Sequence, residues 1–195
     1  MNENTGNPTV VNTEIEGLRS DDGTGIIASD TSGDPVIRSV KTTNVGPGVR
    51  FYQSTGNWTI ESSTFINLRE DSVGIDATES AGSWTIEDTM IENTTGEDGV
   101  DADDTEGNWI IENITVKNIG KIGIDAENAN APNGPVIRDA TINETDEEGI
   151  DIAGSRSDVL ITETIVRNTG KGEFNNGIRV EEALGDWTIE DTIIE

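Results

Sequence analysis

The sequence predicts an all-β fold, a parallel β-helix of about 7–8 coils that forms one domain over residues 1–195. A unit of about 25 residues repeats along the chain, as in "GNWTIESSTFINLREDSVGIDATESA" from Gly56 and "GSWTIEDTMIENTTGEDGVDADDTE" from Gly82. Each unit carries pairs of apolar residues at i and i+2, which is the pattern of short strands with one face turned inward. Thr, Ile and Val are abundant, and no 3.6-residue period is visible, which argues against a helical repeat.

Three columns of apolar residues mark the expected strands of each coil. The first column, at intervals of roughly 23 to 28 residues, holds Val10, Ile37, Ile60, Ile86, Ile111, Ile137, Ile161 and Ile189. The second holds Ile15, Thr42, Phe65, Ile91, Val116, Ile142, Val166 and Ile194. The third, which follows a Gly, holds Ile26, Val49, Ile75, Val100, Ile124, Ile150 and Ile178. Because one coil cannot bury its apolar face alone, we expect equivalent residues of successive coils to stack.

A column of asparagines follows the second strand of most units. It contains Asn44, Asn67, Asn93, Asn118 and Asn168. Stacked amides that point inward at a sharp turn could hydrogen-bond to one another and satisfy buried polar groups. Alternatively, Asn stands there because it tolerates a left-handed backbone conformation. The sequence favours the inward ladder and leaves the second interpretation open.

The units of the form "WTIEDTxIENTxGxxGID" resemble those of right-handed parallel β-helix repeat proteins of the pectate-lyase-like superfamily, from about Pro8 to Glu195. The resemblance implies a right-handed coil with three short strands. It does not imply one function, because the superfamily includes lyases, hydrolases, adhesins, tail spikes and structural solenoids. Its lyases use a calcium–carboxylate cluster with a basic Arg or Lys, and its hydrolases use paired Asp with His-Gly and Arg-x-Lys elements. This chain has no His and no Arg-x-Lys, so we expect no catalysis.

The composition is strongly acidic, with 39 Asp and Glu against 12 Lys and Arg and a formal net charge of −27. Two like charges on adjacent coils, about 4.8 Å apart, repel by about 0.9 kcal/mol in water. At about 1 M salt the Debye length is only about 3 Å, so most of this repulsion is screened. Such a surface resembles that of proteins from salt-loving microbes, particularly haloarchaea. It makes nucleic acids and anionic membranes poor partners.

The absence of Cys and His excludes disulfides, thiolate zinc sites and an imidazole base. The N-terminal segment "MNENTGNPTV" lacks an apolar run, so we expect no signal peptide in this chain and no membrane insertion. A location outside the cell or on its surface would make this chain a processed piece. The last unit stops after its second strand, which predicts either a continuing solenoid or end-to-end stacking of copies.

Two columns of carboxylates are candidate cation sites. One is formed by Asp76, Asp101, Asp125 and Asp151, flanked by Arg50 and Arg179. Turn residues Asp98, Asp103 and Asp104 add to Asp101 as a calcium candidate. The second column is formed by Glu61, Glu87 and Glu112, between Arg38 and Arg138. Stacked carboxylates could share Ca²⁺ or other cations, although no cofactor is required. The favoured alternative is a hydrated acidic face whose Arg ends relieve repulsion.

Four tryptophans share one column, with Trp187 in the last unit, and the three from consecutive units are candidate carbohydrate-binding residues. They are Trp58, Trp84 and Trp109. Stacked indoles could form a platform for sugar rings. However, each stands two residues before an inward Ile, and Pro fills the same column in other units, which favours packing at a corner.

Together these patterns predict a non-catalytic structural or adhesive β-solenoid of the cell surface or extracellular space of a halophile. End-to-end assembly would extend it into filaments, because head-to-tail contacts that do not close generate them. The alternative is a carbohydrate-binding or polysaccharide-cleaving β-helix module, which would need a cleft beside the Trp column.

Overall fold

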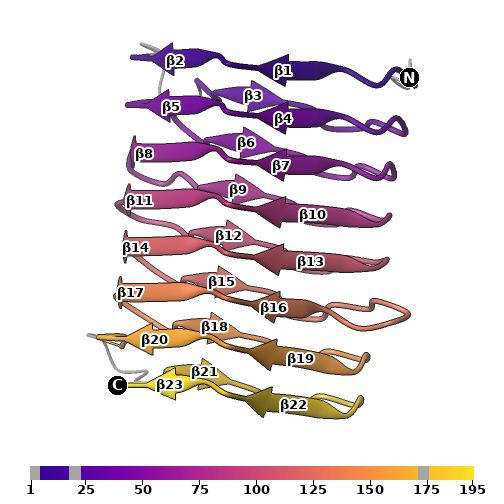
Figure 1. The fold of residues 1–195 in the computed structure, drawn as a ribbon, viewed down its shortest axis with the longest axis vertical. Helices are drawn as coiled ribbons and strands as arrows, with labels where there is room; N and C mark the ends of the chain where they lie inside the picture. Colours follow the sequence, from indigo (N-terminus) through magenta and orange to yellow (C-terminus); the bar gives the residue numbers. More distant parts are fainter. Residues whose placement is uncertain (1–4, 18–22, 171–175) are drawn as a thin grey trace.

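A computed structural model describes residues 5–17, 23–170 and 176–195. These residues form short strands joined by turns, and no helix occurs among them. The chain winds into a stack of similar coils, with the first coil at one end and the last at the other (Figure 1). The predicted all-β parallel β-helix is therefore confirmed.

Each coil contributes one strand to each of three parallel sheets. The first sheet contains β1 (Thr9–Val11), β4 (Val36–Arg38), β7 (Thr59–Glu61), β10 (Trp84–Glu87), β13 (Trp109–Glu112), β16 (Val136–Arg138), β19 (Val159–Thr162) and β22 (Trp187–Glu190). The second contains β2 (Glu14–Glu16), β5 (Lys41–Thr43), β8 (Thr64–Leu68), β11 (Met90–Thr94), β14 (Thr115–Ile119), β17 (Thr141–Thr145), β20 (Ile165–Arg167) and β23 (Ile193–Ile194). The third contains β3 (Ile26–Ile27), β6 (Val49–Arg50), β9 (Ile75–Asp76), β12 (Val100–Asp101), β15 (Ile124–Asp125), β18 (Ile150–Asp151) and β21 (Ile178–Arg179).

The register of the sheets aligns the three predicted apolar columns. In the middle coils, Ile86 pairs with Ile60 and Ile111, Ile91 with Phe65 and Val116, and Val100 with Ile75 and Ile124. All nine side chains are fully buried, and they belong to one continuous core. Because the side chains of a strand alternate between its two faces, this register commits the residues between them to the outside.

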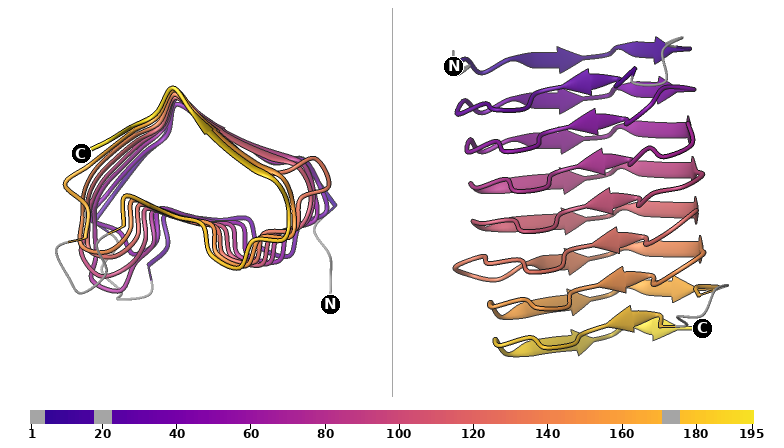
Figure 2. Two further views of the ribbon diagram at one scale, coloured as in Figure 1. Left: turned by 90° about the horizontal axis from the view of Figure 1, so that it is seen from below. Right: turned by 180° about the vertical axis from the view of Figure 1, so that it is seen from behind.

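Every coil turns at corners where one residue adopts a left-handed backbone conformation. Between the first and second sheets these residues are Asn12, Ser39, Ser62, Asp88, Asn113, Asp139, Glu163 and Asp191, with φ between 48° and 52°. After the third sheet they are Asp30, Gln53, Glu79, Asp104, Asn128, Gly154 and Glu182. The same corners recur from coil to coil, so successive coils superpose when viewed along the axis (Figure 2).

The asparagine column forms the corner after the second sheet, but its side chains do not point inward. Asn67 and Asn118 are exposed and Asn93 is half-buried, all with φ between 53° and 61°. The inward position is taken by the next residue of each strand, which is the buried Leu68 or Ile119 in two of these coils. The predicted inward orientation is therefore wrong, and the left-handed alternative accounts for the column.

The exposed asparagine amides nevertheless contact each other between coils. Asn93 Nδ2 donates to Asn67 Oδ1 at 2.8 Å, and Asn118 Nδ2 donates to Asn93 Oδ1 at 2.7 Å. Asn168 donates instead to Asn143 Oδ1, at 2.9 Å. Asn44 is exposed with φ 55°. The column thus forms a surface ladder over three coils.

A glycine before each third-sheet strand allows close approach of neighbouring coils. A Cβ built on Gly99 would lie 2.5 Å from the carbonyl oxygen of Gly123 and 2.7 Å from Val116 Cγ1. Both distances are far shorter than normal van der Waals contact. The Gly that introduces the third apolar column is therefore required by packing against the second column.

Sequence reasoning missed a second ladder, formed by Asn and Asp side chains just before the first-sheet strands. The backbone N–H groups of Asp34, Asn57, Ser83, Asn133 and Asp186 donate to Oδ1 of Asn7, Asp34, Asn57, Asn108 and Asp158, at 2.8–2.9 Å. Each bond joins one coil to the next. The signal in the sequence is an Asn or Asp directly before the Pro and Trp column.

Candidate functional site

The acidic row of the third sheet runs along the outer side of its strands. Asp101 pairs in register with Asp76 on one side and Asp125 on the other, and Asp151 follows Asp125. The row is less hydrated than expected, since Asp76, Asp125 and Asp151 are only 8%, 5% and 1% exposed. The prediction of a hydrated carboxylate face is therefore wrong for these three side chains.

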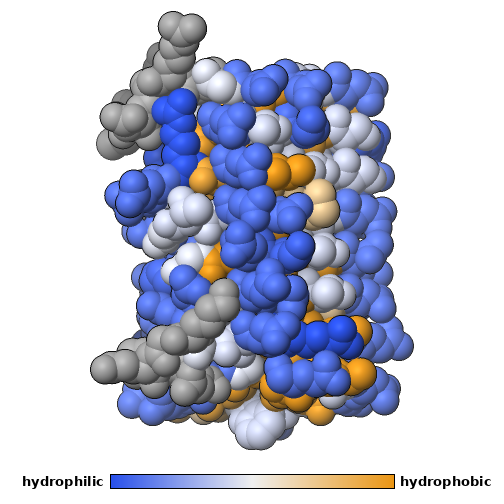
Figure 3. Space-filling view, turned by 90° about the vertical axis from the view of Figure 1, so that its left-hand side faces the viewer, coloured by the Kyte–Doolittle hydropathy of each residue, from blue (hydrophilic) through white to orange (hydrophobic). Residues whose placement is uncertain are grey.

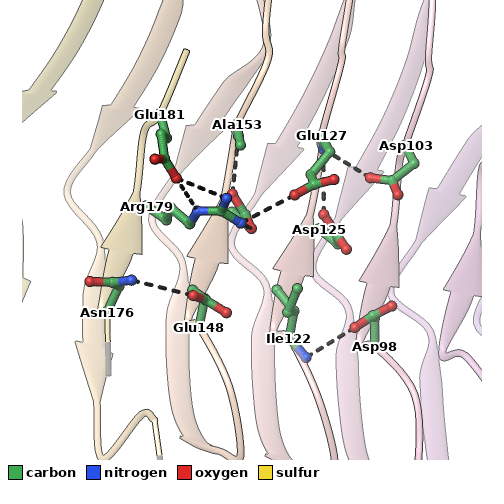
Figure 4. A network of polar contacts seen from close by, with 11 residues as sticks. Asp98, Asp103, Ile122, Asp125, Glu127, Glu148, Ala153, Asn176, Arg179 and Glu181 are labelled. Atoms are coloured by element: carbon green, nitrogen blue, oxygen red, sulfur yellow. Dashed lines mark hydrogen bonds and ion pairs between the residues drawn. The ribbon is translucent and has the colours of Figure 1, made fainter. Parts of the chain in front are cut away.

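Arginines neutralise both ends of this row. Arg50 Nε lies 2.8 Å from Asp76 Oδ2, and Arg179 Nη1 lies 2.8 Å from Asp151 Oδ2. Arg179 also bonds Glu127 at 3.2 Å and Glu181 at 2.9 Å, so its guanidinium links carboxylates from three coils (Figure 4). Sequence reasoning placed Arg179 at the end of the row but missed this bridging role.

In the middle of the row, two carboxylates meet at one backbone donor. The Glu127 N–H donates to Asp103 Oδ1 at 2.8 Å and is 3.4 Å from Asp125 Oδ1 (Figure 4). Burial, followed by the charge of Asp103, raises the pKa of Asp125 to about 9. Burial, followed by the charge of Asp101, raises the pKa of Asp103 to about 6. These two carboxyl groups therefore do not both ionise readily at neutral pH.

Asp98 does not belong to the acidic row, because it lies in the turn before β12. It is 2% exposed, accepts the Ile122 N–H at 3.0 Å and lies 3.2 Å from Lys121 Nζ. Burial raises its pKa to about 6, although the nearby Lys121 opposes that shift.

Asp104, the remaining turn residue of the calcium candidate, is a left-handed corner residue with φ 52°.

Among residues 5–17, 23–170 and 176–195, no three Asp or Glu side chains are arranged to hold a metal ion. Asp98 is bound to Lys121, and Asp103 faces Asp125 rather than Asp98. A shared Ca²⁺ along these carboxylates stays a prediction.

The second carboxylate row also has arginines at both ends. Glu61 bonds Arg38, and Glu112 bonds Arg138. Glu87 lies between them in register, and burial followed by the charge of Glu61 raises its pKa. A hollow of about 450 Å³ beside this row is lined by Glu87, Asp88, Glu112, Asn113 and Asp139. Its carboxylates would repel an anionic sugar chain.

The Trp column lies inside the coil. Trp58, Trp84 and Trp109 are 1%, 1% and 0% exposed. Their rings form a parallel stack that begins at Phe51, with centroid separations of 4.1, 4.5 and 4.9 Å along the series. No sugar ring can reach these indoles in this structure. The platform interpretation is therefore wrong for them, and the packing interpretation accounts for the column.

A family model described as "Right handed beta helix region" matches residues 1–168. The chain belongs to the right-handed β-helix family. No curated protein matches the sequence. In the part of the chain that the structure describes, no helix has the length and apolar character needed to cross a membrane.

The β-helix fold occurs in proteins of many functions, so the fold alone does not indicate what this chain does. The side chains of the surface rows are the more informative feature. Several charged groups in and beside the third-sheet row contact groups on neighbouring coils. Arg50, Lys121 and Arg179 each bond a carboxylate, and Asp103 and Asp125 share one N–H. The arrangement is suited to holding coils together and to attracting cations from solution.

Proposed function

We propose that this chain is a non-catalytic structural or adhesive β-solenoid of the cell surface or extracellular space of a halophile. One observation carries the proposal: the Trp column and the ends of the acidic row, which were the candidates for sugar and cation binding, make contacts between coils. The indoles of Trp58 and Trp84 stack on each other in the core, and Arg179 bridges carboxylates from three coils. The product of these contacts is a stiff, repetitive rod.

The charge distribution supports the assignment to a salt-rich environment. Acidic rows lie on two sheets, and only their end members have arginine partners. The face shown in Figure 3 is mostly hydrophilic. Repulsion among the exposed carboxylates, in a chain with a formal net charge of −27, opposes folding at low ionic strength and is screened at molar salt. Loosely held cations would serve the same purpose without a fixed coordination site.

The carbohydrate-cleaving alternative has less support in the geometry. Paired catalytic carboxyl groups stand about 5 Å apart or more, on either side of the bond they cleave. Asp103 and Asp125 instead reach the same N–H. The buried Trp column removes the expected sugar platform.

The proposal is tested by two measurements on the 195-residue chain. The urea concentration at half-unfolding, followed by circular dichroism, is compared in about 0.1 M and about 1 M NaCl. We expect a clear rise with salt and no loss of viscosity when the chain is incubated with acidic or neutral polysaccharides. An unchanged midpoint would remove the halophile argument, and polysaccharide depolymerisation would overturn the non-catalytic role.

A further inference from the structure

A row of three exposed side chains follows the turns between the third and first sheets. This edge row consists of Glu106, Asn130 and Arg156, one from each of three successive coils. Glu106 and Asn130 are paired by a parallel β-bridge. The Asn130 N–H donates to the Thr105 carbonyl at 2.8 Å. The Arg156 N–H donates to the Ala129 carbonyl at 3.1 Å, so the same backbone bond repeats and holds the row in line.

The side chains of the edge row have no hydrogen-bonding or ion-pairing partner among the described residues. The guanidinium groups of Arg138 and Arg179, in contrast, each bond a carboxylate of another coil. With 39 Asp and Glu in the chain against 12 Lys and Arg, a guanidinium without a carboxylate is unexpected. Arg156 is therefore available to a carboxylate of another molecule.

The order of charges makes the edge row complementary to itself. A two-fold axis through Asn130, perpendicular to the rod, brings Glu106 of each copy to Arg156 of the other. Asn130 then faces the same amide, which can both donate and accept a hydrogen bond. The row continues with Ala81 on one side and Leu184 on the other, in the same backbone pattern. The same axis brings these two apolar side chains together.

The two carboxylate rows lack this property. An axis through Glu87, at the middle of the first-sheet row, would bring Arg38 to Arg138 of a second copy. An axis at the middle of the third-sheet row would bring Arg50 to Arg179. Both are contacts between like charges, which oppose association. Of these three rows, the edge row is the one that can pair with itself.

The shape of this edge fits the same axis. Asn130 stands seven residues before the inward Ile137, whereas Glu106 stands five before Ile111. The turn of residues 131–134 therefore protrudes beyond the turns of the two neighbouring coils (Figure 2). On the other side of the edge row, a hollow of about 430 Å³ is lined by Asp104, Glu106, Asn128, Asn130 and Arg156. Because the axis exchanges the two sides of the row, the protruding turn of each copy lies against the hollow of the other.

We propose that two copies of this chain pair side by side and antiparallel through their edge rows, about a two-fold axis at Asn130. The inference rests on the proposed structural role and names a second copy as its partner. From Ala81 to Leu184 the contact spans four steps of about 4.8 Å, about 19 Å in all. This is short for a protein interface, so the pair is weak and forms at high protein concentration. Each copy carries a formal net charge of −27, and molar salt screens the long-range repulsion more than it screens ion pairs in contact.

The test measures the mass of the 195-residue chain by sedimentation equilibrium in about 1 M NaCl, over a range of protein concentrations. We expect a monomer–dimer equilibrium. Arg156→Glu and Glu106→Arg each place like charges at both ion pairs, so each should weaken the dimer at least about fivefold. Arg167→Glu and Glu70→Arg make the same charge changes at exposed positions elsewhere. These matched controls should dimerise as the unchanged chain does, and circular dichroism checks that all four variants fold.

A mixture of the two weakened variants gives the sharpest result. In a mixed pair, both arginines of the Glu106→Arg copy face the glutamates of the Arg156→Glu copy. An equimolar mixture should therefore form heterodimers about as tightly as the unchanged chain forms homodimers. A mixture that associates no better than either variant alone overturns the proposal. An unchanged chain that stays monomeric, or a dimer that neither variant weakens, overturns it as well.

A single cysteine reports the position of the axis. The chain has no Cys, so Asn130→Cys introduces one thiol, and Asn118→Cys introduces one at an exposed position on the second sheet. A residue on the axis meets its own counterpart, so a short bifunctional thiol reagent should crosslink Asn130→Cys into dimers. The Asn118→Cys control should stay largely monomeric. Equal crosslinking of the two variants would refute this axis.

The outcome is separable from that of the proposed function. A monomeric chain with salt-dependent stability and no polysaccharide cleavage would refute only the pairing. A dimer that requires Arg156 and also depolymerises a polysaccharide would refute only the non-catalytic role.

Discussion

The hydrogen bond between Trp109 and Thr105 offers a sharp test of the coil interior. Trp109 Nε1 donates to Thr105 Oγ1 at 3.1 Å, and this hydroxyl donates to the Ala102 carbonyl at 2.9 Å. In the preceding coil Ser80 takes the corresponding position, but its hydroxyl donates to the Phe51 carbonyl. The indole N–H of Trp84 then finds no partner among the described residues. Thr105→Val should place Trp109 in the same state.

The expected loss has two parts. Removing the hydroxyl deletes its own bond to the carbonyl, worth about 1 kcal/mol, and leaves a buried indole N–H unsatisfied, which costs about 1–3 kcal/mol. Val has nearly the shape of Thr, so no cavity contributes. We therefore expect the free energy of unfolding to fall by about 2–4 kcal/mol.

A double-mutant cycle isolates the bond itself. Urea unfolding is measured for Thr105→Val, Trp109→Phe and the double variant, by circular dichroism in molar salt. In the Phe background there is no N–H to satisfy, so Thr105→Val should cost about 1 kcal/mol. Ser80→Ala is the control, because the Ser80 hydroxyl donates to the Phe51 carbonyl and accepts no bond from the Trp84 N–H. This variant should also cost about 1 kcal/mol. An equal loss from Thr105→Val in both backgrounds would refute the reasoning.

Two further predictions follow from the packing and from the acidic row. Gly99→Ala places a Cβ 2.5 Å from the Gly123 carbonyl oxygen, so the free energy of unfolding, measured in urea, should fall by about 3 kcal/mol. Gly17→Ala is the control, because its Cβ would meet no atom within 4 Å. It should cost only the penalty of a left-handed backbone, about 1 kcal/mol. The folded-state pKa of Asp125, about 9, lies above its unfolded value of about 3.9, so the native chain holds the proton more tightly and stability falls as pH rises from about 4 to about 9. Asp125→Asn should raise the free energy of unfolding at pH 8 by more than about 1 kcal/mol and flatten its dependence on pH. Asp76→Asn is the control, and it should lower the free energy of unfolding because it breaks the ion pair with Arg50. A steeper pH dependence in Asp125→Asn would contradict the raised pKa of Asp125.

The core could be predicted because the repeat carries its own alignment. Once Ile60, Ile86 and Ile111 are recognised as one column, stacking and parallel register follow from the need to bury them. The same reasoning orients Trp84, which stands two residues before Ile86 on the same strand and so shares its inward face. The packing of the indoles was therefore within reach of the sequence.

Asn93, like Trp84, stands two residues from an inward side chain, but its own side chain points outward. It stands two residues after Ile91, so strand alternation predicts an inward side chain. The structure gives it a φ of 61°, and a left-handed residue interrupts the alternation. The buried position passes to the next residue, Thr94. The sequence pattern shows that a turn residue stands here, but not which way its side chain points.

The acidic row shows a second limit of the sequence. Alternation puts Asp125 and Asp151 on the opposite face of their strands from Ile124 and Ile150, and only these two isoleucines belong to the apolar core. Their exposure, however, depends on side chains from neighbouring coils, namely Asp103 beside Asp125 and Arg179 beside Asp151. The exposed fraction and pKa of these aspartates are therefore properties of the stack.

The sequence by itself determined the period of the coil, the three strands, the members of each apolar column and the sign of the surface charge. These depend on local alternation and on the requirement to bury apolar surface. Only the tertiary structure decided which corner side chains face outward and which carboxylates are covered. Those features depend on the backbone angle at single corner residues and on neighbours about 25 residues away, and the order of residues along one coil specifies neither.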